Sequence, residues 1–163
     1  MRLLQRKVWQ CIMGASKKNK TIKQKEFPQS RDIVYGGNPD EYYSKTPSWI
    51  FSNADNEMWT ISKDSLWDDI MPKLKALESK RWGEILVSDK KFNHSIKPNN
   101  LNKAAQDRLI DKHVEADAII SLRISGNHRL YGYMSGSAFN ILWYDVDHGD
   151  NDTCVCRSYL KHT

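Results

Sequence analysis

Two arginines are the residues whose spacing first indicates chemistry. They lie in the stretch "SLRISGNHRLYGYMSGSAFNILWYDVDH", Ser121 to His148, whose Ser-Gly-Asn and Ser-Gly-Ser triplets predict two tight hairpin turns. A three-residue first loop places Ile124 opposite His128. The same register places Arg123 directly opposite Arg129. Like charges at a cross-strand pair are destabilising, and a bound phosphate would neutralise them because guanidinium groups present forked donors that fit its oxygens.

The side chains of these strands divide between two faces, because successive residues of a strand point to opposite sides. One face is apolar and is expected to lie under helices; it collects Ile120, Leu122, Ile124, Leu130, Met134, Ala138 and Leu142. The other face is rich in arginine and aromatic residues; it collects Ser121, Arg123, Arg129, Tyr131, Tyr133, Phe139, Ile141, Trp143 and Asp145. Aromatic rings stack on unpaired bases. This face therefore predicts a surface for RNA, with Tyr131, Tyr133 and Trp143 as the stacking side chains.

The same face also has a purely structural interpretation. In it, Asp145 bridges the two arginines, and the preceding residues 44–65 cover the aromatic rings. That segment, "SKTPSWIFSNADNEMWTISKDS", carries Trp49, Phe51 and Trp59 among turn-forming residues, and it is expected to dock on the domain as a loop-rich strap. Both interpretations hold together if the strap leaves only the arginine end of the face open.

Two histidines are candidates for proton transfer. Cleavage of RNA by its own 2′-hydroxyl group needs a base, an acid, and donors that stabilise the charge developing at phosphorus. Histidine suits the proton transfers because its ordinary pKa lies near neutrality. His94 lies in the basic stretch "KKFNHSIKP" with Lys91, a candidate nucleic-acid-binding residue, and His148 follows the last predicted strand. The two arginines would stabilise charge, whereas His128 falls on the helix-covered face and is expected to be structural.

No metal or other cofactor is expected. The spacing H-x5-C-x-C-x5-H, which runs from His148 to His162, is not a standard zinc-finger pattern. The three cysteines, Cys11, Cys154 and Cys156, make a poor disulfide framework, which favours a reducing cytoplasmic location. The sequence also has no run of apolar residues long enough to span a membrane.

Two helices are expected to precede the strands. Ser65 and Asp68 have the form of a capping box, and Pro72 should kink or restart the helix that follows. Its apolar residues at helical spacing are Leu66, Trp67, Ile70, Leu74 and Leu77. Asn99 or Asn100 can cap a second helix. Its apolar side holds Leu101, Ala104, Ala105 and Leu109.

Helix, helix and three strands, in that order, predict an α+β fold. The strands are expected at 118–125, 128–134 and 138–145, as an antiparallel meander with both helices packed on one face. Residues 44–163 would form this single domain. Residues 1–43 are expected to be a basic, flexible, loop-rich extension, because ten Lys and Arg but only four acids fall within the first 45 residues of a chain of net charge +5. A basic arm of this kind suits a polyanionic partner.

The order of elements resembles the RelE/ParE superfamily of bacterial toxins. The strands "SLRISGNHRLYGYM" and "FNILWYDVDH" look like the last three strands of that family, and the resemblance covers residues 64–148. The chain is longer than typical members at its N-terminus, and "DVDHGDNDTCVCRSYLKHT" replaces their basic, aromatic ending. Arg123 and Arg129 match the family's phosphate-binding arginines, whereas the match fixes no acid or base.

This resemblance implies a toxin of a toxin–antitoxin system that cleaves RNA, including messenger RNA on the ribosome. Family members with this activity use arginines and lysines of the sheet face without a metal, and a partner antitoxin neutralises them. Two alternatives remain open. One is a non-catalytic nucleic-acid-binding or regulatory protein, and the other is a ParE-like protein that inhibits a protein target.

Overall fold

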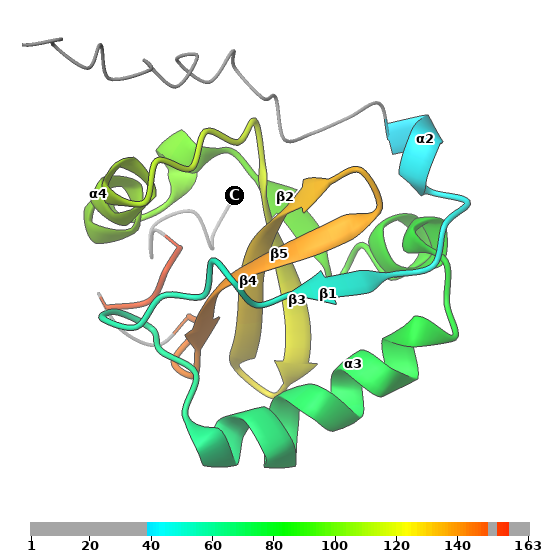
Figure 1. The fold of residues 1–163 in the computed structure, drawn as a ribbon, viewed down its shortest axis with the longest axis horizontal. Coiled ribbons are helices and arrows are strands. Elements are labelled where there is room, and N and C mark those ends of the chain that lie inside the picture. The colour runs from blue at the N-terminus through cyan, green and yellow to red at the C-terminus, as the bar shows by residue number, and fades with distance from the viewer. Residues whose placement is uncertain (1–38, 150–152, 157–163) are drawn as a thin grey trace, which may run out of the picture. The chain divides into compact units, whose positions relative to one another are not determined.

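A mixed sheet of five strands forms the centre of the computed structural model, which describes residues 39–149 and 153–156. The strand order is β1-β5-β4-β3-β2; β1 is parallel to β5, and the other neighbours are antiparallel (Figure 1). The bounds are β1 Ser48–Ile50, β2 His94–Ile96, β3 Ile119–Ser125, β4 His128–Ser135 and β5 Ala138–Asp145. The α+β class and the three-stranded meander are thus confirmed. The strands β1 and β2 were not predicted, because three residues are too few to show alternation.

The first hairpin keeps the two arginines opposite each other by means of a β-bulge. Ser125 pairs with His128, so the turn contains two residues and not the three expected. The register then shifts, leaving Ile124 as the extra residue, and Arg123 pairs with Arg129. The predicted arginine pair is confirmed, whereas the prediction that Ile124 faces His128 is wrong.

A second bulge exchanges the two side-chain faces in part of the last strand. Leu142 is the extra residue in β5, where the pairing with β4 shifts by one. Because the side-chain period of a strand is two, this shift places Phe139 and Ile141 on the side opposite to the one predicted. Both pack in the same core as Leu130, whereas Leu142 packs with Trp143. The faces predicted from alternation are wrong in this strand because no feature of the sequence indicates the bulge.

Close packing at this bulge leaves no room for a side chain at Gly132 of β4. A Cβ atom there would meet the backbone oxygen of Asn140 and would lie 2.7 Å from the Phe139 ring. We expect Gly132→Ala to lower the free energy of unfolding by about 2 kcal/mol, since overpacking a core typically costs that much. Urea unfolding of the variant measures the loss. An unchanged midpoint would show that β4 and β5 are not packed this closely.

The first predicted helix begins one turn earlier than expected. The Ser62 hydroxyl oxygen accepts a hydrogen bond from the Ser65 backbone N–H at 3.0 Å, so Ser62 and not Ser65 provides the cap. A π-helical segment, η1 (Ser65–Ile70), leads directly into α3 (Met71–Glu78). Pro72 lies in the first turn of α3, at the change from π-helix to α-helix, and the backbone stays helical through this junction.

The second predicted helix, α4 (Lys103–Asp111), begins after Asn102. The Asn102 side-chain oxygen accepts a hydrogen bond from the Ala105 backbone N–H at 2.8 Å. The two asparagines expected to cap this helix instead belong to a short 3₁₀ turn, η3 (Pro98–Asn100). The expected position of the cap is therefore wrong by two or three residues.

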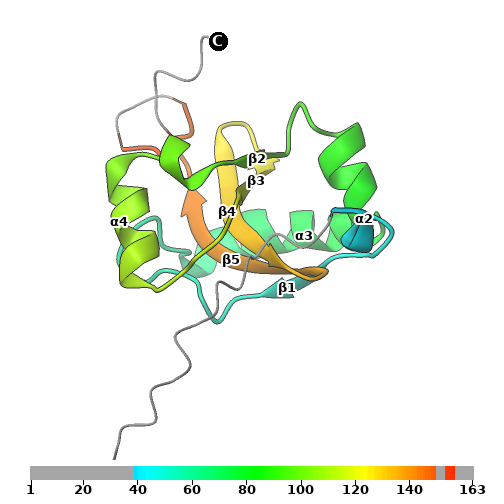
Figure 2. The same cartoon turned by 90° about the horizontal axis from the view of Figure 1, so that it is seen from above.

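Helices cover both faces of the sheet, and not one face as predicted (Figures 1 and 2). The α3 core consists of Tyr42, Ile70, Leu74, Leu77, Trp82, Ile85, Ile120, Leu122, Ile124, Leu130, Met134, Phe139, Ile141 and Tyr144. The α4 core consists of Leu101, Ala105, Leu109, Ile119, Tyr131, Tyr133, Leu142, Trp143 and Val155. A further π-helical segment, η2 (Glu84–Ser88), contributes Ile85 to the α3 core.

Most of the predicted N-terminal extension, residues 1–43, lies outside the described residues. Its last part forms a short helix, α2 (Pro39–Tyr42), and Tyr42 is buried in the α3 core. The folded domain thus begins somewhat before residue 44. No helix among residues 39–149 and 153–156 is long and apolar enough to cross a membrane.

Candidate functional site

The facing arginines lie at the end of the first hairpin, and both are half-buried. In the described part of the chain, neither forms an ion pair with a carboxylate. Arg129 Nη1 donates to the backbone oxygens of Gly126 at 2.9 Å and His128 at 3.0 Å, and the buried Nε of Arg129 has no hydrogen-bond partner. Burial and the neighbouring charge of Arg123 lower the pKa of the Arg129 guanidinium. The pair is therefore a concentration of positive charge suited to an anion.

Asp145 does not bridge these arginines, although it pairs with Arg129 in the sheet register. Its carboxylate is buried and accepts hydrogen bonds from the backbone N–H groups of Val155 at 2.9 Å and Asp147 at 3.0 Å. Burial raises the pKa of Asp145, and these two hydrogen bonds act against that shift. The acid thus anchors the segment after β5, so this part of the structural interpretation is wrong.

A basic loop brings further cationic and aromatic groups to the arginine pair. The Arg123 guanidinium lies 5.0 Å from the centre of the exposed Phe92 ring, and the Lys91 ammonium lies 5.9 Å from it. The side-chain oxygen of Asn93, which is buried, accepts a hydrogen bond from the Arg123 backbone N–H at 2.9 Å and fixes this loop against β3. Lys91 and Arg123 therefore share the Phe92 ring as a neighbour.

His94 is the predicted proton-transfer residue that the fold places next to the arginines. It begins β2, where it pairs with Ser121 of β3. His94 is exposed at the surface, but loss of water around its imidazole and the positive charge of Arg129 lower the pKa of this group. The neutral form, which accepts a proton, is therefore favoured at neutral pH. We call Lys91, Phe92, His94, Arg123 and Arg129 the arginine site.

A hollow of about 490 Å³ adjoins the arginine site on the side of α3. Its lining residues are Lys73, Ala76, Leu77, Lys80, Asp89, Phe92, Asn93, Arg123 and Ile124. The one acid among them, Asp89, pairs with Lys80 at 2.9 Å. Lys73 and Arg123 therefore give the hollow an excess of positive charge that extends the arginine site.

The predicted stacking residues Tyr131, Tyr133 and Trp143 are all buried. The strap covers them: the Trp59 ring packs edge-on against Trp143 at 5.5 Å, and the Asn53 side chain donates to the Tyr133 hydroxyl at 2.6 Å. The helix α4 completes the cover, since all three rings belong to its core. The expectation that these rings are open to bases is therefore wrong, and the predicted docking of the strap is confirmed.

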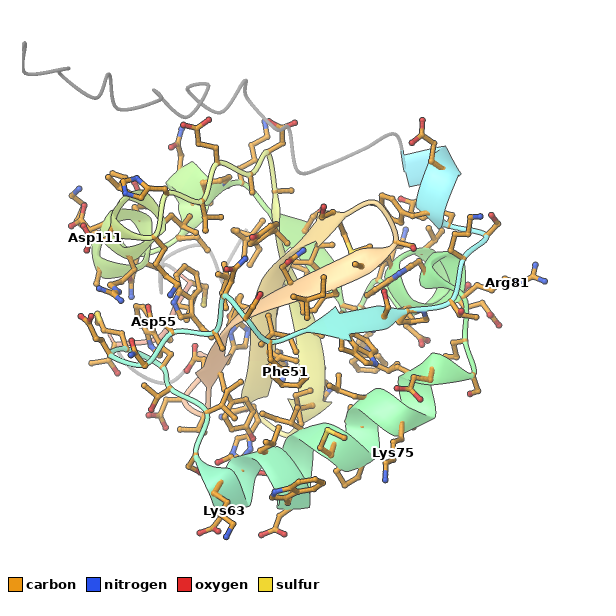
Figure 3. The ribbon with its side chains drawn as sticks, viewed as in Figure 1. Phe51, Asp55, Lys63, Lys75, Arg81 and Asp111 are labelled. Carbon is orange, nitrogen blue, oxygen red and sulfur yellow. The ribbon has the colours of Figure 1, made fainter. Side chains whose placement is uncertain are left out.

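A buried ion pair that the sequence did not reveal fastens the strap. Asp55 accepts two hydrogen bonds of 2.8 Å from the Nε and Nη2 atoms of Arg108 in α4, and one of 3.1 Å from the Trp143 indole (Figure 3 shows Asp55 below α4). Burial alone would raise the pKa of Asp55, but the bonds from Arg108, the Glu57 backbone and Trp143 hold it below its ordinary range. Asp55 and Arg108 lie 53 positions apart, so no local sequence pattern predicts their pairing.

His148 and His128 form hydrogen bonds with tyrosine hydroxyls in two different parts of the domain. His148 Nδ1 lies 2.9 Å from the Tyr131 hydroxyl, so this predicted catalytic residue contacts a side chain of the α4 core. His128 bonds to the Tyr144 hydroxyl at 2.8 Å, and that hydroxyl donates to Asp69 of η1 at 3.0 Å. This agrees with the structural role expected for His128.

Comparison of the chain with family models, with curated proteins and with solved structures found no match. The function is therefore inferred from the geometry of the arginine site. That geometry consists of a facing arginine pair, a histidine that favours its neutral form, and an adjoining cationic hollow.

Proposed function

We propose that this protein binds RNA at the arginine site and cleaves it there, as an endoribonuclease of the toxin–antitoxin type. One observation carries the proposal: Arg123 and Arg129 face each other in register, and no carboxylate among the described residues pairs with either. A fold keeps such a pair at a cost in stability. An RNA phosphate between the two guanidinium groups would remove that cost.

The roles in cleavage follow from the positions of the groups. Neutral His94 would take the proton of the 2′-hydroxyl, and the 2′-oxygen would then attack the adjacent phosphorus. The bond between phosphorus and the 5′-oxygen breaks, and the departing oxygen takes a proton from water. The two arginines would hold the phosphate and stabilise the charge that develops on its oxygens. Lys91 and Lys73 would bind flanking phosphates, and the exposed Phe92 ring offers a stacking surface in place of the buried aromatic residues. No metal ion takes part in this scheme.

The proposal predicts a particular pH dependence. Since the pKa of His94 is lowered from its ordinary value of about 6.5, the cleavage rate should fall only below that pH, as the imidazole becomes protonated. His94→Gln should remove this acidic limb and slow cleavage about a hundredfold. His113→Asn is the matched control, because this exposed histidine has a φ of 52°, which asparagine tolerates. If the acidic limb of the pH profile persisted in His94→Gln, another residue would be the base.

Two experiments test the function itself. Inducible expression should arrest growth, and mapping of transcript ends should reveal new 5′ ends within messenger RNAs. Purified protein added to a translation extract should produce the same cuts. As a toxin, the protein would act in the cytoplasm and would be neutralised by a cognate antitoxin protein. Growth arrest without RNA cleavage would instead indicate a ParE-like inhibitor of a protein target.

A non-catalytic nucleic-acid-binding protein is the second candidate. It is favoured by the observation that His148, one of the two predicted catalytic histidines, is already held by the Tyr131 hydroxyl and the Cys156 thiol. This candidate predicts RNA binding whose affinity falls steeply with salt, because each phosphate contact releases counterions. Such binding, with transcripts left intact in both experiments, would replace the endoribonuclease proposal.

A further inference from the structure

Two thiols are held side by side in residues 153–156, the segment that closes the α4 core. The backbone of this segment is fixed from three sides. The Trp59 indole donates to the Thr153 oxygen at 2.9 Å, Asn102 N–H donates to the Val155 oxygen at 2.9 Å, and Val155 N–H donates to Asp145 at 2.9 Å. Cys154 and Cys156 therefore flank an anchored, fully buried valine.

The sulfur atoms of this pair lie in contact. Cys154 Sγ and Cys156 Sγ are 3.4 Å apart, and neither forms a disulfide. A disulfide bond is about 2.05 Å long, so the atoms would have to approach by only about 1.4 Å. Cys154 is buried, whereas Cys156 is partly exposed. A small oxidant therefore has access to Cys156 first.

A histidine lies next to the accessible thiol. His148 Nδ1 is 3.4 Å from Cys156 Sγ and 2.9 Å from the Tyr131 hydroxyl. An imidazole at this distance can take the thiol proton, and the thiolate is the reactive form of cysteine. Among the described residues, no group of three His, Cys, Asp or Glu side chains is arranged to hold a metal ion. Covalent thiol chemistry is thus the use that this arrangement supports.

We propose that Cys156 is a hydroperoxide-reactive thiol and that Cys154 is its resolving partner. In the first step, the Cys156 thiolate attacks one peroxide oxygen; a sulfur–oxygen bond forms, the oxygen–oxygen bond breaks, and an alcohol or water leaves with the proton. In the second step, Cys154 Sγ attacks Cys156 Sγ; the sulfur–sulfur bond forms, and hydroxide leaves and takes the Cys154 proton as water. Two thiols lose two electrons to one peroxide.

Mass spectrometry tests this proposal on the full chain carrying Cys11→Ser, which leaves only this pair of thiols. After hydrogen peroxide treatment and alkylation under denaturing conditions, the tryptic peptide containing both cysteines should have lost two hydrogen atoms and carry no alkyl group. Cys154→Ser should instead stop at a sulfenic acid that dimedone traps. Cys156→Ser should remain reduced.

The role of His148 is tested by the rate at which Cys156 is alkylated. His148→Gln should slow alkylation of Cys156 by iodoacetamide at pH 7 about tenfold, because the imidazole raises the fraction of thiolate. Far-ultraviolet circular dichroism of the same variant checks that it is folded. Two free thiols in the peroxide-treated protein, or disulfide-linked dimers in place of the internal bond, would overturn the proposal. Equal alkylation rates with and without His148 would remove the histidine from it.

Discussion

Arg123→Gln is expected to abolish RNA cleavage and growth inhibition while leaving the thermal midpoint unchanged or slightly raised. Donors aimed at a developing charge are typically worth about 3 kcal/mol, which corresponds to a loss of about a hundredfold in rate. The stability change is small and of opposite sign, because relieving a cross-strand repulsion contributes a few tenths of a kcal/mol. Arg129→Gln should lose activity as well. It should also lose some stability, because Arg129 donates to two backbone oxygens of the hairpin.

The matched control for these variants is Arg81→Gln. Arg81 is exposed and projects away from the domain, so the same loss of one charge occurs outside the arginine site (Figure 3). It should cleave at the rate of the parent. An Arg123→Gln variant that is destabilised but fully active would show that the pair serves the fold alone. Equal losses in all three variants would show that net charge, and not position, governs activity.

Asp55→Asn is expected to lower the free energy of unfolding by about 3 kcal/mol, because removing one partner leaves the other charge of a buried pair uncompensated. The effect should depend on pH. A carboxylate whose pKa is lowered by folding stabilises fully above its unfolded pKa of about 3.9, and this contribution is lost as the pH falls towards the lowered value. The difference between parent and variant should therefore be largest near neutrality and shrink below pH 4.

The control is Asp111→Asn, which removes an exposed partner of the same arginine. Asp111 lies 3.5 Å from Arg108 and is 62% exposed, so we expect a change of less than about 0.5 kcal/mol. Urea unfolding at pH 7 and pH 3 measures both variants. If Asp55→Asn cost no more than Asp111→Asn, the strap would not be fastened by this ion pair. The covering of Trp143 would then need another explanation.

The sequence predicted the elements whose cause is local. Glycine turns and alternating residues specified the meander, and the register that places Arg123 opposite Arg129 follows from the hairpin. Helical spacing specified α3 and α4, and Pro72 lies where η1 changes into α3. The predicted positions of the helix caps were less accurate, because several Ser and Asn residues near each helix start can serve as the cap.

Other features depend on contacts between distant residues. Periodicity shows that α4 has an apolar side, but not which sheet face it covers; Val155, on the segment beyond the sheet, helps to complete that core. The bulge at Leu142 exchanges the faces of half a strand without a sequence signal. The sequence likewise did not show the pairing of Asp55 with Arg108, which lie 53 positions apart. His94 was found because the basic stretch around it is a local feature of the sequence.

The parallel pairing of β1 with β5 has a consequence for the order of folding. Ser48 meets Ala138 in this pair, so the edge of the sheet closes only when two segments come together that are separated by α3, α4 and the first two strands of the meander. Contacts of such high sequence separation slow folding. On the ribosome, β1 and the strap must wait for the last strand to emerge. We expect the hairpins of β3, β4 and β5 to form first, and β1 to join a sheet that already exists.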